Sequence, residues 1–272
     1  MTIGQRISSR RKTLGLTQQR MAEVLHVSFQ AVSKWENDVA LPDVMLLAPI
    51  ARVLHTSVDA LIGFQPVPGT EYEQRYQGEE YYWGIRPNRL CYDILQLKPP
   101  VRPCRVLDIG CGEGKDAVFL ARNGYRVSAF DIADAGLAKA DRLAEYHGTA
   151  VEFFKADILD FQPEGMYDIV FSSGVFHYLP PEKRNEVIGR LKEHTAPHGL
   201  HVINVFVEKP FIAPPPDTEA AETSHPAWKS GELFMHYHDW LLHKTEEMIF
   251  DCKSGGVPHQ HCMDVLIAQR PE

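Results

Sequence analysis

The chain has 272 residues, of which 44% are hydrophobic and 24% charged, and its formal net charge is −8. This composition is typical of a globular protein with one large or two smaller domains. No apolar run approaches the ~20 residues of a membrane-spanning helix, and the first residues lack the apolar stretch of a secretory signal, so we expect a cytoplasmic protein. The five cysteines show no repeated spacing, which favours reduced thiols over a disulfide framework.

Charge is unevenly distributed along the chain. Residues 1–66 hold seven Lys/Arg and five Asp/Glu, a balance of +2, whereas the remaining residues hold 21 against 31, a balance of −10. A weakly basic head on an acidic body fits nucleic-acid binding by the head alone. The same +2 is also common for an inert helical domain, so charge by itself does not assign DNA binding.

The basic head shows apolar residues at helical spacing, which predicts an all-α domain of five helices. Thr17 can cap a helix that runs to about Leu25, and Ser28 can cap a second helix that ends near Asn37. The turn between them is only about three residues long. The two helices must therefore cross steeply, with apolar side chains filling the angle.

The run L-T-Q-Q-R-M-A-E-V-L-H-V-S-F-Q-A-V-S-K-W-E-N-D resembles the phage-repressor (Xre-like) helix-turn-helix family, and the likeness covers about residues 3–63. The resemblance implies that the second helix enters the major groove of double-stranded DNA and that a homodimer reads two half-sites. The implied DNA contacts are Gln18, Ser28, Gln30, Ser33, Lys34 and Asn37, with further phosphate contacts by Arg10, Arg11 and Lys12. The alternative is a solvated helix face on a domain that only dimerises.

Two prolines, two glycines and several charges gather in residues 64–80, which predicts a linker over residues 67–80. Strand-like runs and helical stretches then alternate along residues 81–272. Because parallel neighbouring strands need a long connection, this alternation predicts a parallel sheet with crossover helices. A Pro-rich stretch over residues 206–230 cannot be regular throughout, and such segments are often lids or binding loops.

The run V-L-D-I-G-C-G-E-G ends an apolar strand at Asp108 and continues with Gly110, Gly112 and Gly114. Residues without a Cβ atom allow a sharp turn and close approach to a ligand. The dinucleotide fingerprint would need a glycine where Lys115 stands, which argues against a nicotinamide cofactor. The run instead resembles motif I of the class I S-adenosylmethionine-dependent methyltransferases. The resemblance implies an α/β fold, a doubly wound Rossmann-like sheet of seven strands with an antiparallel last strand, and S-adenosyl-L-methionine as cofactor.

Later strands end in acids and small residues at positions that fit this resemblance. Asp131 ends the second strand, where a carboxylate can accept both ribose hydroxyls. Asp157 follows the third strand, where the family uses an acid to accept from the adenine amino group. Ligands bind at the carboxyl ends of strands in such sheets. The implied cofactor-binding residues are Asp108, Gly110, Cys111, Gly112, Gly114, Asp131, Ile132, Asp157, Ile158, Ser173 and Gly174.

The methyl acceptor is harder to predict, because the protein mainly aligns acceptor and cofactor. His177 follows the fourth strand, and its near-neutral reference pKa would suit a general base and a substrate contact. Packing, or a contact to the cofactor, is the alternative role. Tyr82 and Trp83 belong to an aromatic cluster ahead of the first strand and could line the substrate site or merely cover the end of the sheet.

The body of the chain resembles the tellurite-resistance methyltransferase family over most of residues 82–270. The likeness is carried by Gly231, Glu232, Leu233, Tyr237 and Trp240. It implies a small acceptor such as a chalcogen oxyanion, a metalloid or a thiol, although the last hairpin lacks the arginines that some members use. His259 and His261 would share one face of a strand and contact the substrate. With Cys252 on the partner strand and with His236 and His238 on the preceding helix, they could form a soft ligand set. The spacing fits no established zinc signature, so we assign no metal.

The sequence thus predicts a methyltransferase for a small molecule, combined with sequence-specific DNA binding as a transcriptional regulator. Two alternatives stay open. In the first, the protein is a transcription factor whose methyltransferase-like domain only senses the cofactor or a small ligand. In the second, it is a detoxifying enzyme whose helical head merely dimerises. Turnover of the cofactor distinguishes an enzyme from the first alternative. Salt-dependent retention of DNA distinguishes a DNA-binding head from the second alternative.

Overall fold

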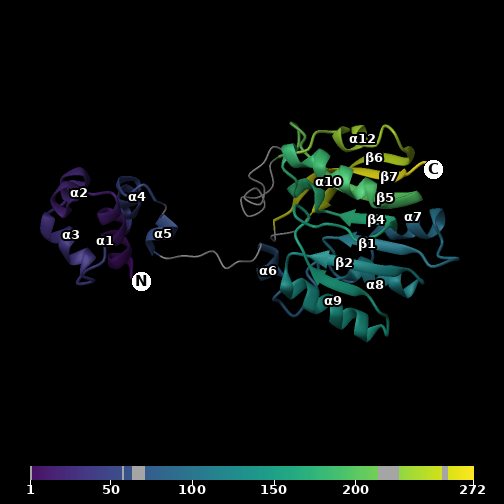
Figure 1. The fold of residues 1–272 in the computed structure, drawn as a ribbon, viewed down its shortest axis with the longest axis horizontal. Helices are drawn as coiled ribbons and strands as arrows, with labels where there is room; N and C mark the ends of the chain where they lie inside the picture. Colours follow the sequence, from purple (N-terminus) through teal and green to yellow (C-terminus); the bar gives the residue numbers. More distant parts are fainter. Residues whose placement is uncertain (1, 57, 63–70, 214–226, 253–256) are drawn as a thin grey trace. The chain divides into compact units, whose positions relative to one another are not determined.

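The chain divides into two compact units, Met1–Pro68 and Gly69–Glu272. The computed structural model describes residues 2–56, 58–62, 71–213, 227–252 and 257–272 (Figure 1). None of the helices in this described part has the length and apolar character that crossing a membrane requires. Each unit has its own hydrophobic core and is treated by itself.

The first unit consists of helices only, as predicted. They are α1 (Ile3–Thr13), α2 (Gln18–Leu25), α3 (Phe29–Glu36), α4 (Val44–Val53) and α5 (Val58–Ile62). The predicted caps of α2 and α3 are confirmed, because the Thr17 side chain accepts from the backbone of Arg20 and the Ser28 side chain accepts from that of Ala31. Apolar side chains from all five helices meet in one core that includes Val32.

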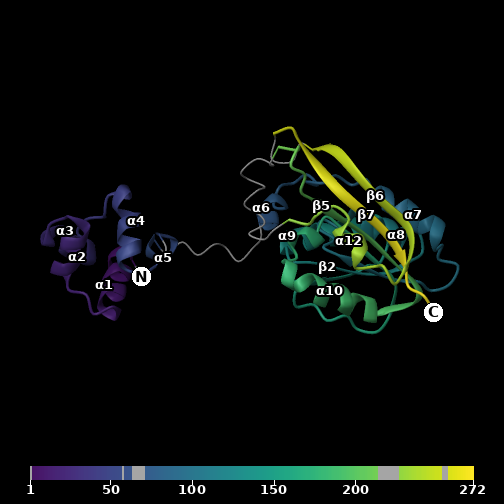
Figure 2. The same ribbon diagram turned by 90° about the horizontal axis from the view of Figure 1, so that it is seen from above.

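The second unit is built on one seven-stranded sheet. Its strands are β1 (Arg105–Ile109), β2 (Arg126–Asp131), β3 (Glu152–Lys155), β4 (Tyr167–Ser173), β5 (Thr195–Val207), β6 (Leu241–Cys252) and β7 (His259–Gln269). Their order is β3-β2-β1-β4-β5-β7-β6, with β7 antiparallel to both of its neighbours and the other pairs parallel. The predicted fold, including its antiparallel last strand, is confirmed. Figure 2 shows the long β6–β7 hairpin at one edge of the sheet.

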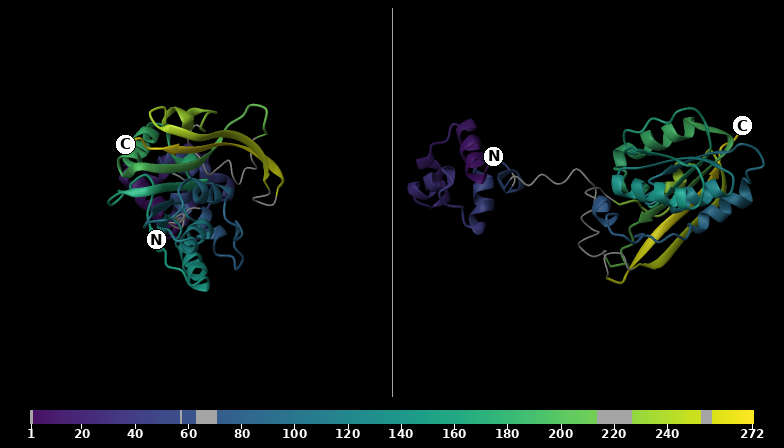
Figure 3. Two further views of the ribbon diagram at one scale, coloured as in Figure 1. Left: turned by 90° about the vertical axis from the view of Figure 1, so that its right-hand side faces the viewer. Right: turned by 90° about the horizontal axis from the view of Figure 1, so that it is seen from below.

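Helices cover both faces of this sheet (Figure 3). The helices of the unit are α6 (Glu71–Arg75), α7 (Arg89–Leu97), α8 (Lys115–Arg122), α9 (Asp134–Tyr146), α10 (Pro181–Glu193) and α12 (Glu232–Met235), with a 3₁₀ turn η1 at Phe176–Tyr178. Because side chains alternate along a strand, Val106 of β1 packs toward α7 and α8, while Leu107 and Ile109 pack toward α10. The carboxyl ends of β1, β2 and β4 meet at one edge of the sheet, where the cavity described below opens.

The structure differs from the prediction at the linker. Helix α6 lies inside residues 67–80 and packs against α9. The Glu73 carboxylate accepts from the backbone N–H of Ala135, in the first turn of α9, at 3.1 and 3.2 Å. Tyr76 is only 5% exposed. Residues 71–80 therefore belong to the second unit. The central part of the predicted Pro-rich loop, residues 214–226, lies outside the described residues.

Candidate functional site

A cavity of about 700 Å³ opens at the carboxyl ends of the central strands. Nine of the predicted cofactor-binding residues line it: Gly110, Cys111, Gly112, Asp131, Ile132, Asp157, Ile158, Ser173 and Gly174. The other two, Asp108 and Gly114, do not. The cavity also has walls from α6 and β5, which the sequence did not predict, and from other residues of the β6–β7 hairpin than the two predicted histidines.

The glycine-rich loop after β1 passes close beneath this cavity. Gly110, Gly112 and Gly114 have φ values of +69°, +52° and +81°, which favour glycine. A Cβ atom on Gly112 would lie 2.9 Å from the Tyr76 hydroxyl, and one on Gly114 would lie 2.5 Å from the Ala140 side chain. Gly112 thus keeps the floor of the cavity free of side chains. Gly114 does not reach the cavity, which corrects its predicted contact, and instead lets α8 start close to α9.

Asp131 ends β2 and fastens the glycine-rich loop. Its Oδ2 accepts the Gly112 N–H at 2.8 Å and its Oδ1 accepts the Ala133 N–H at 2.9 Å. The side chain is buried, and burial raises its pKa above the ordinary 3.8 despite these hydrogen bonds. Each carboxylate oxygen has a second lone pair. Asp131 can therefore hold the loop and accept from a ligand at the same time.

Asp108 is placed differently from the prediction. It points from β1 toward α8 and not into the cavity, because it shares a strand face with Val106. Its side chain is buried, and its Oδ2 has no hydrogen-bond partner among the described residues. Burial and the charge of Asp116 raise its pKa well above 3.8. Asp108 therefore does not line the cavity, which corrects the predicted cofactor contact.

An aromatic group covers one side of the cavity. Tyr72, Tyr76, Trp83 and Tyr178 line it. The Trp83 indole donates to the Tyr76 hydroxyl at 3.2 Å, and the Tyr178 hydroxyl donates to that of Tyr72 at 2.8 Å. Of these four, only Trp83 is predicted from the sequence. The spacing of four between Tyr72 and Tyr76, which would place both on one face of a helix, was the available signal, but it fell inside the predicted linker.

Polar groups from three elements meet at Ser173, at the end of β4. The Asn88 and Asn204 amides donate to its Oγ at 2.9 and 3.0 Å. Asn204 also accepts the Gly174 N–H at 2.7 Å through its Oδ1. Because the Ser173 oxygen accepts twice, its hydroxyl hydrogen is left to donate toward the cavity that the residue lines.

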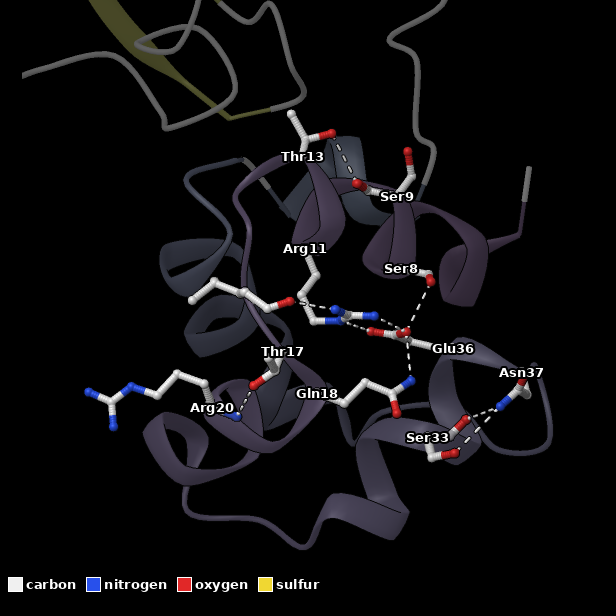
Figure 4. Close-up of polar contacts among 11 residues, drawn as sticks. Ser8, Ser9, Arg11, Thr13, Thr17, Gln18, Arg20, Ser33, Glu36 and Asn37 are labelled. Atoms are coloured by element: carbon white, nitrogen blue, oxygen red, sulfur yellow. Dashed lines mark hydrogen bonds and ion pairs between the residues drawn. The ribbon is translucent and has the colours of Figure 1, made fainter.

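In the first unit, a buried ion pair joins α1 to α3 (Figure 4). Arg11 and Glu36 approach to 2.5 Å, and their side chains are 9% and 4% exposed. The same carboxylate accepts from Ser8 at 2.9 Å and from the Gln18 amide at 2.8 Å. Arg11 is therefore enclosed and cannot reach DNA phosphate, which corrects that prediction. Gln18 is likewise held by Glu36 through its amide.

The opposite face of α3 is open to solvent. Gln30, Lys34 and Asn37 are exposed and Ser33 is half-buried, whereas Ser28 is used as the helix cap. The Asn37 amide donates back to the Ser33 carbonyl at 2.8 Å. Arg10, in contrast, donates to the backbone carbonyls of Leu54 and His55 and so ties α1 to the end of α4. Lys12 is exposed.

Each unit resembles a domain of known proteins. The family described as a methyltransferase domain matches residues 106–199, and a helix-turn-helix family matches residues 7–61. Hemagglutinin 1 of Eikenella corrodens is 30% identical over 65% of this chain and 58% of its own length. The probable S-adenosyl-L-methionine-dependent methyltransferase TehB of Haemophilus influenzae is 29% identical over 57% of this chain and 56% of its own length. The crystal structure of TehB from Haemophilus influenzae, 22% identical, has a TM-score of 0.58 and covers 73% of this chain and 65% of that one.

The chain carries a methyltransferase domain preceded by a helix-turn-helix domain. The relative from Haemophilus influenzae is described as dependent on S-adenosylmethionine, the cofactor that the sequence predicts. The predicted resemblances to a helix-turn-helix family and to a methyltransferase family are thereby confirmed at the level of the domains. The chain spans just over half the length of the curated relatives it matches.

His177 of the methyltransferase domain is poorly placed for the predicted general base. It does not line the cavity, and its Nδ1 is buried without a hydrogen-bond partner among the described residues. Its ring packs against Phe206, with 4.7 Å between centroids. Burial, together with the charge of His261, lowers its pKa to about 3. The position after β4 did suggest proximity to the cavity, but the side chain turns into the wall.

The end of the cavity away from the glycine-rich loop is apolar. Its lining there comes from Phe206, Phe250 and Met263 of β5, β6 and β7, the strands that lie beyond β4 from β1 in the sheet. The predicted substrate residues Tyr82, His259 and His261 do not line it, and Tyr82 instead packs edge-on against Trp83. The two histidines lie farther along the β7 face that carries Met263.

Proposed function

We propose that the methyltransferase domain transfers a methyl group to a small soft nucleophile, and that a thiol attached to an apolar group suits the cavity best. The observation that supports this is the lining of one cavity, which has a glycine-floored part with Asp131 and Asp157 and a second part with apolar side chains of β5, β6 and β7. In the first part, the glycine-rich loop would lie under the methionine and ribose of the cofactor, Asp131 would accept the ribose hydroxyls, and Asp157 would accept the adenine amino group beside Ile158.

The residues present fit such a cofactor. Small-molecule sites usually have volumes of roughly 300–1,000 Å³ and few convergent polar groups, and the cavity has about 700 Å³. A Cβ atom at Gly112 would fill the cradle. The Asp157 carboxylate is fixed by the Leu159 N–H at 2.9 Å. When bound, the cofactor supplies a methyl group on a sulfonium, so the protein itself has only to align the acceptor and receive its proton.

The charges around the cavity favour a thiol over an oxyanion. Lys115 is the single lysine or arginine among the described lining residues, and it is paired with Asp116 at 2.6 Å. An oxyanion at the apolar end would therefore lack a counter-charge. A thiol, with a reference pKa near ~8.5, loses its proton more readily than an alcohol and needs no strong base. This matters because His177 is not available as one.

Turnover by the full chain tests this proposal. Purified protein with S-adenosylmethionine should release S-adenosylhomocysteine with small aromatic thiols, faster than with selenite or tellurite. Gly112→Ala should slow release strongly, because its Cβ would lie 2.9 Å from the Tyr76 hydroxyl and a φ of +52° is unfavourable for alanine, whereas Gly189→Ala on α10 meets nothing within 4 Å and should not. If no acceptor in the panel yields product while the cofactor still binds, the cofactor-sensing alternative is supported instead.

We also propose that the helix-turn-helix domain binds double-stranded DNA as a homodimer through α3, as part of a transcriptional regulator. Gln30 and Ser33 would face base edges, and Lys34 and Asn37 would contact phosphate or bases. The support is the sidedness of α3: Val32 and Trp35 are buried in the core while Gln30 and Lys34 are exposed. The α3 side chains that we assign to DNA are therefore open to solvent.

A further inference from the structure

The end of the β6–β7 hairpin brings together three side chains that bind metals. Cys252, His259 and His261 offer ligand atoms that all lie within 4.8 Å of one another, and all three are half-buried. The strand register produces this, because Cys252 pairs directly with His259. His261 follows two residues along β7 on the same face. The cluster thus depends on pairing between two strands, which explains why its linear spacing matches no zinc signature.

The protonation of His259 is arranged as in a metal ligand. Its Nδ1 lies 2.7 Å from the Val257 carbonyl oxygen, which can only accept, so Nδ1 carries the proton. The Nε2 atom is then left with a lone pair, and it lies 2.8 Å from the Nε2 of His261. Metal-binding histidines commonly donate their second N–H to a carbonyl in this way, which fixes the ring and its tautomer.

One thiolate and two imidazoles form a donor set of borderline softness. It suits Zn²⁺ and related transition metals, whereas Ca²⁺ and Mg²⁺ require oxygen ligands. Tetrahedral zinc with bonds of about 2.0–2.3 Å sets its ligand atoms roughly 3.3–3.6 Å apart. The widest pair here must close by roughly an ångström and the two histidines must open by about half of one. Side-chain rotations at a half-buried hairpin end can supply such shifts.

We propose that Cys252, His259 and His261 bind one Zn²⁺ ion, with a fourth position left open. The site would lie behind one wall of the methyltransferase cavity. The His261 ring stacks on Phe206 at 4.8 Å and lies 5.7 Å from Phe250, and both phenylalanines line the cavity. A bound ion would therefore fix the hairpin and the apolar wall that faces the acceptor.

Titration of the metal-free full chain with Zn²⁺ alone, against a competing chromophoric chelator, tests the site. We expect one ion per chain. Cys252→Ser and His261→Ala should each weaken binding by at least about 10–100-fold, the loss that outer-shell partners alone produce. His243→Ala is the matched control, since His243 is an exposed histidine of the same hairpin, and it should bind as the unchanged chain does.

Two further measurements use the unchanged protein, so they do not depend on whether a variant folds. Co²⁺ added in place of Zn²⁺ should give a thiolate-to-metal charge-transfer band, and Zn²⁺ should protect Cys252 from alkylation by iodoacetamide as mapped by mass spectrometry. Absence of stoichiometric binding, or equal binding by Cys252→Ser, overturns the proposal. Equal alkylation of Cys252 with and without the ion does so as well. These readouts involve neither cofactor nor acceptor, so they are independent of whether the domain transfers methyl groups.

Discussion

At the scale of single residues, Asp131 has two tasks, because it holds the glycine-rich loop and faces the cavity. We expect Asp131→Asn to weaken cofactor binding by about 1–3 kcal/mol, the cost of poorly paired polar groups. Burial raises the pKa of Asp131 above 3.8. The unchanged protein should therefore start to lose affinity at a higher pH than an exposed aspartate would, whereas Asp131→Asn should show no such acid limb. Calorimetry across pH measures both, and equal affinity of the two proteins at neutral pH would contradict the ribose assignment.

At the scale of elements, the α1–α3 contact depends on Arg11 and Glu36. Arg11→Met should lower the free energy of unfolding of this unit by about 3–5 kcal/mol, because it leaves a buried carboxylate without its counter-charge. Arg20→Met is the control, since the Arg20–Glu23 pair is exposed and such pairs contribute about 0–1 kcal/mol. Burial alone would raise the pKa of Glu36. Hydrogen bonds from Arg11, Gln18 and Ser8 have the larger combined effect, so the pKa lies below the ordinary 4.5. The ion pair should thus stabilise this unit fully above about pH 4.5, and this stabilisation should be lost as the pH falls through the lowered pKa of Glu36. Equal denaturant midpoints for the two variants would argue against it.

At the scale of the whole molecule, the basic head and acidic body predict where duplex DNA is held. Each phosphate contact contributes about −0.9 to the slope of log affinity against log salt. Lys34→Gln should therefore make that slope shallower by about 1. Lys183→Gln, a lysine of the methyltransferase domain whose side chain is 45% exposed, should leave it unchanged. Fluorescence anisotropy of a labelled duplex at several salt concentrations measures this, and an equal effect of both changes would place DNA binding elsewhere.

Much of the architecture could be read from local patterns. The caps Thr17 and Ser28, the apolar runs of the strands and the glycines after β1 each act within a few residues, so their structure is encoded locally. The acid that ends β2 and the acid that follows β3 were predictable for the same reason, because parallel strands deliver their carboxyl ends to a common edge.

The sequence by itself therefore determined two domains, the type of sheet and the strand edge at which the cavity opens. Only the tertiary structure decided which side chains complete it. Helix α6 covers the cavity because it docks on α9, His177 turns into the wall beside Phe206, and Asp108 faces α8. The pairing of Cys252 with His259 likewise follows from the register of the hairpin. Such contacts join residues far apart in the chain, and their geometry depends on packing that no local pattern records.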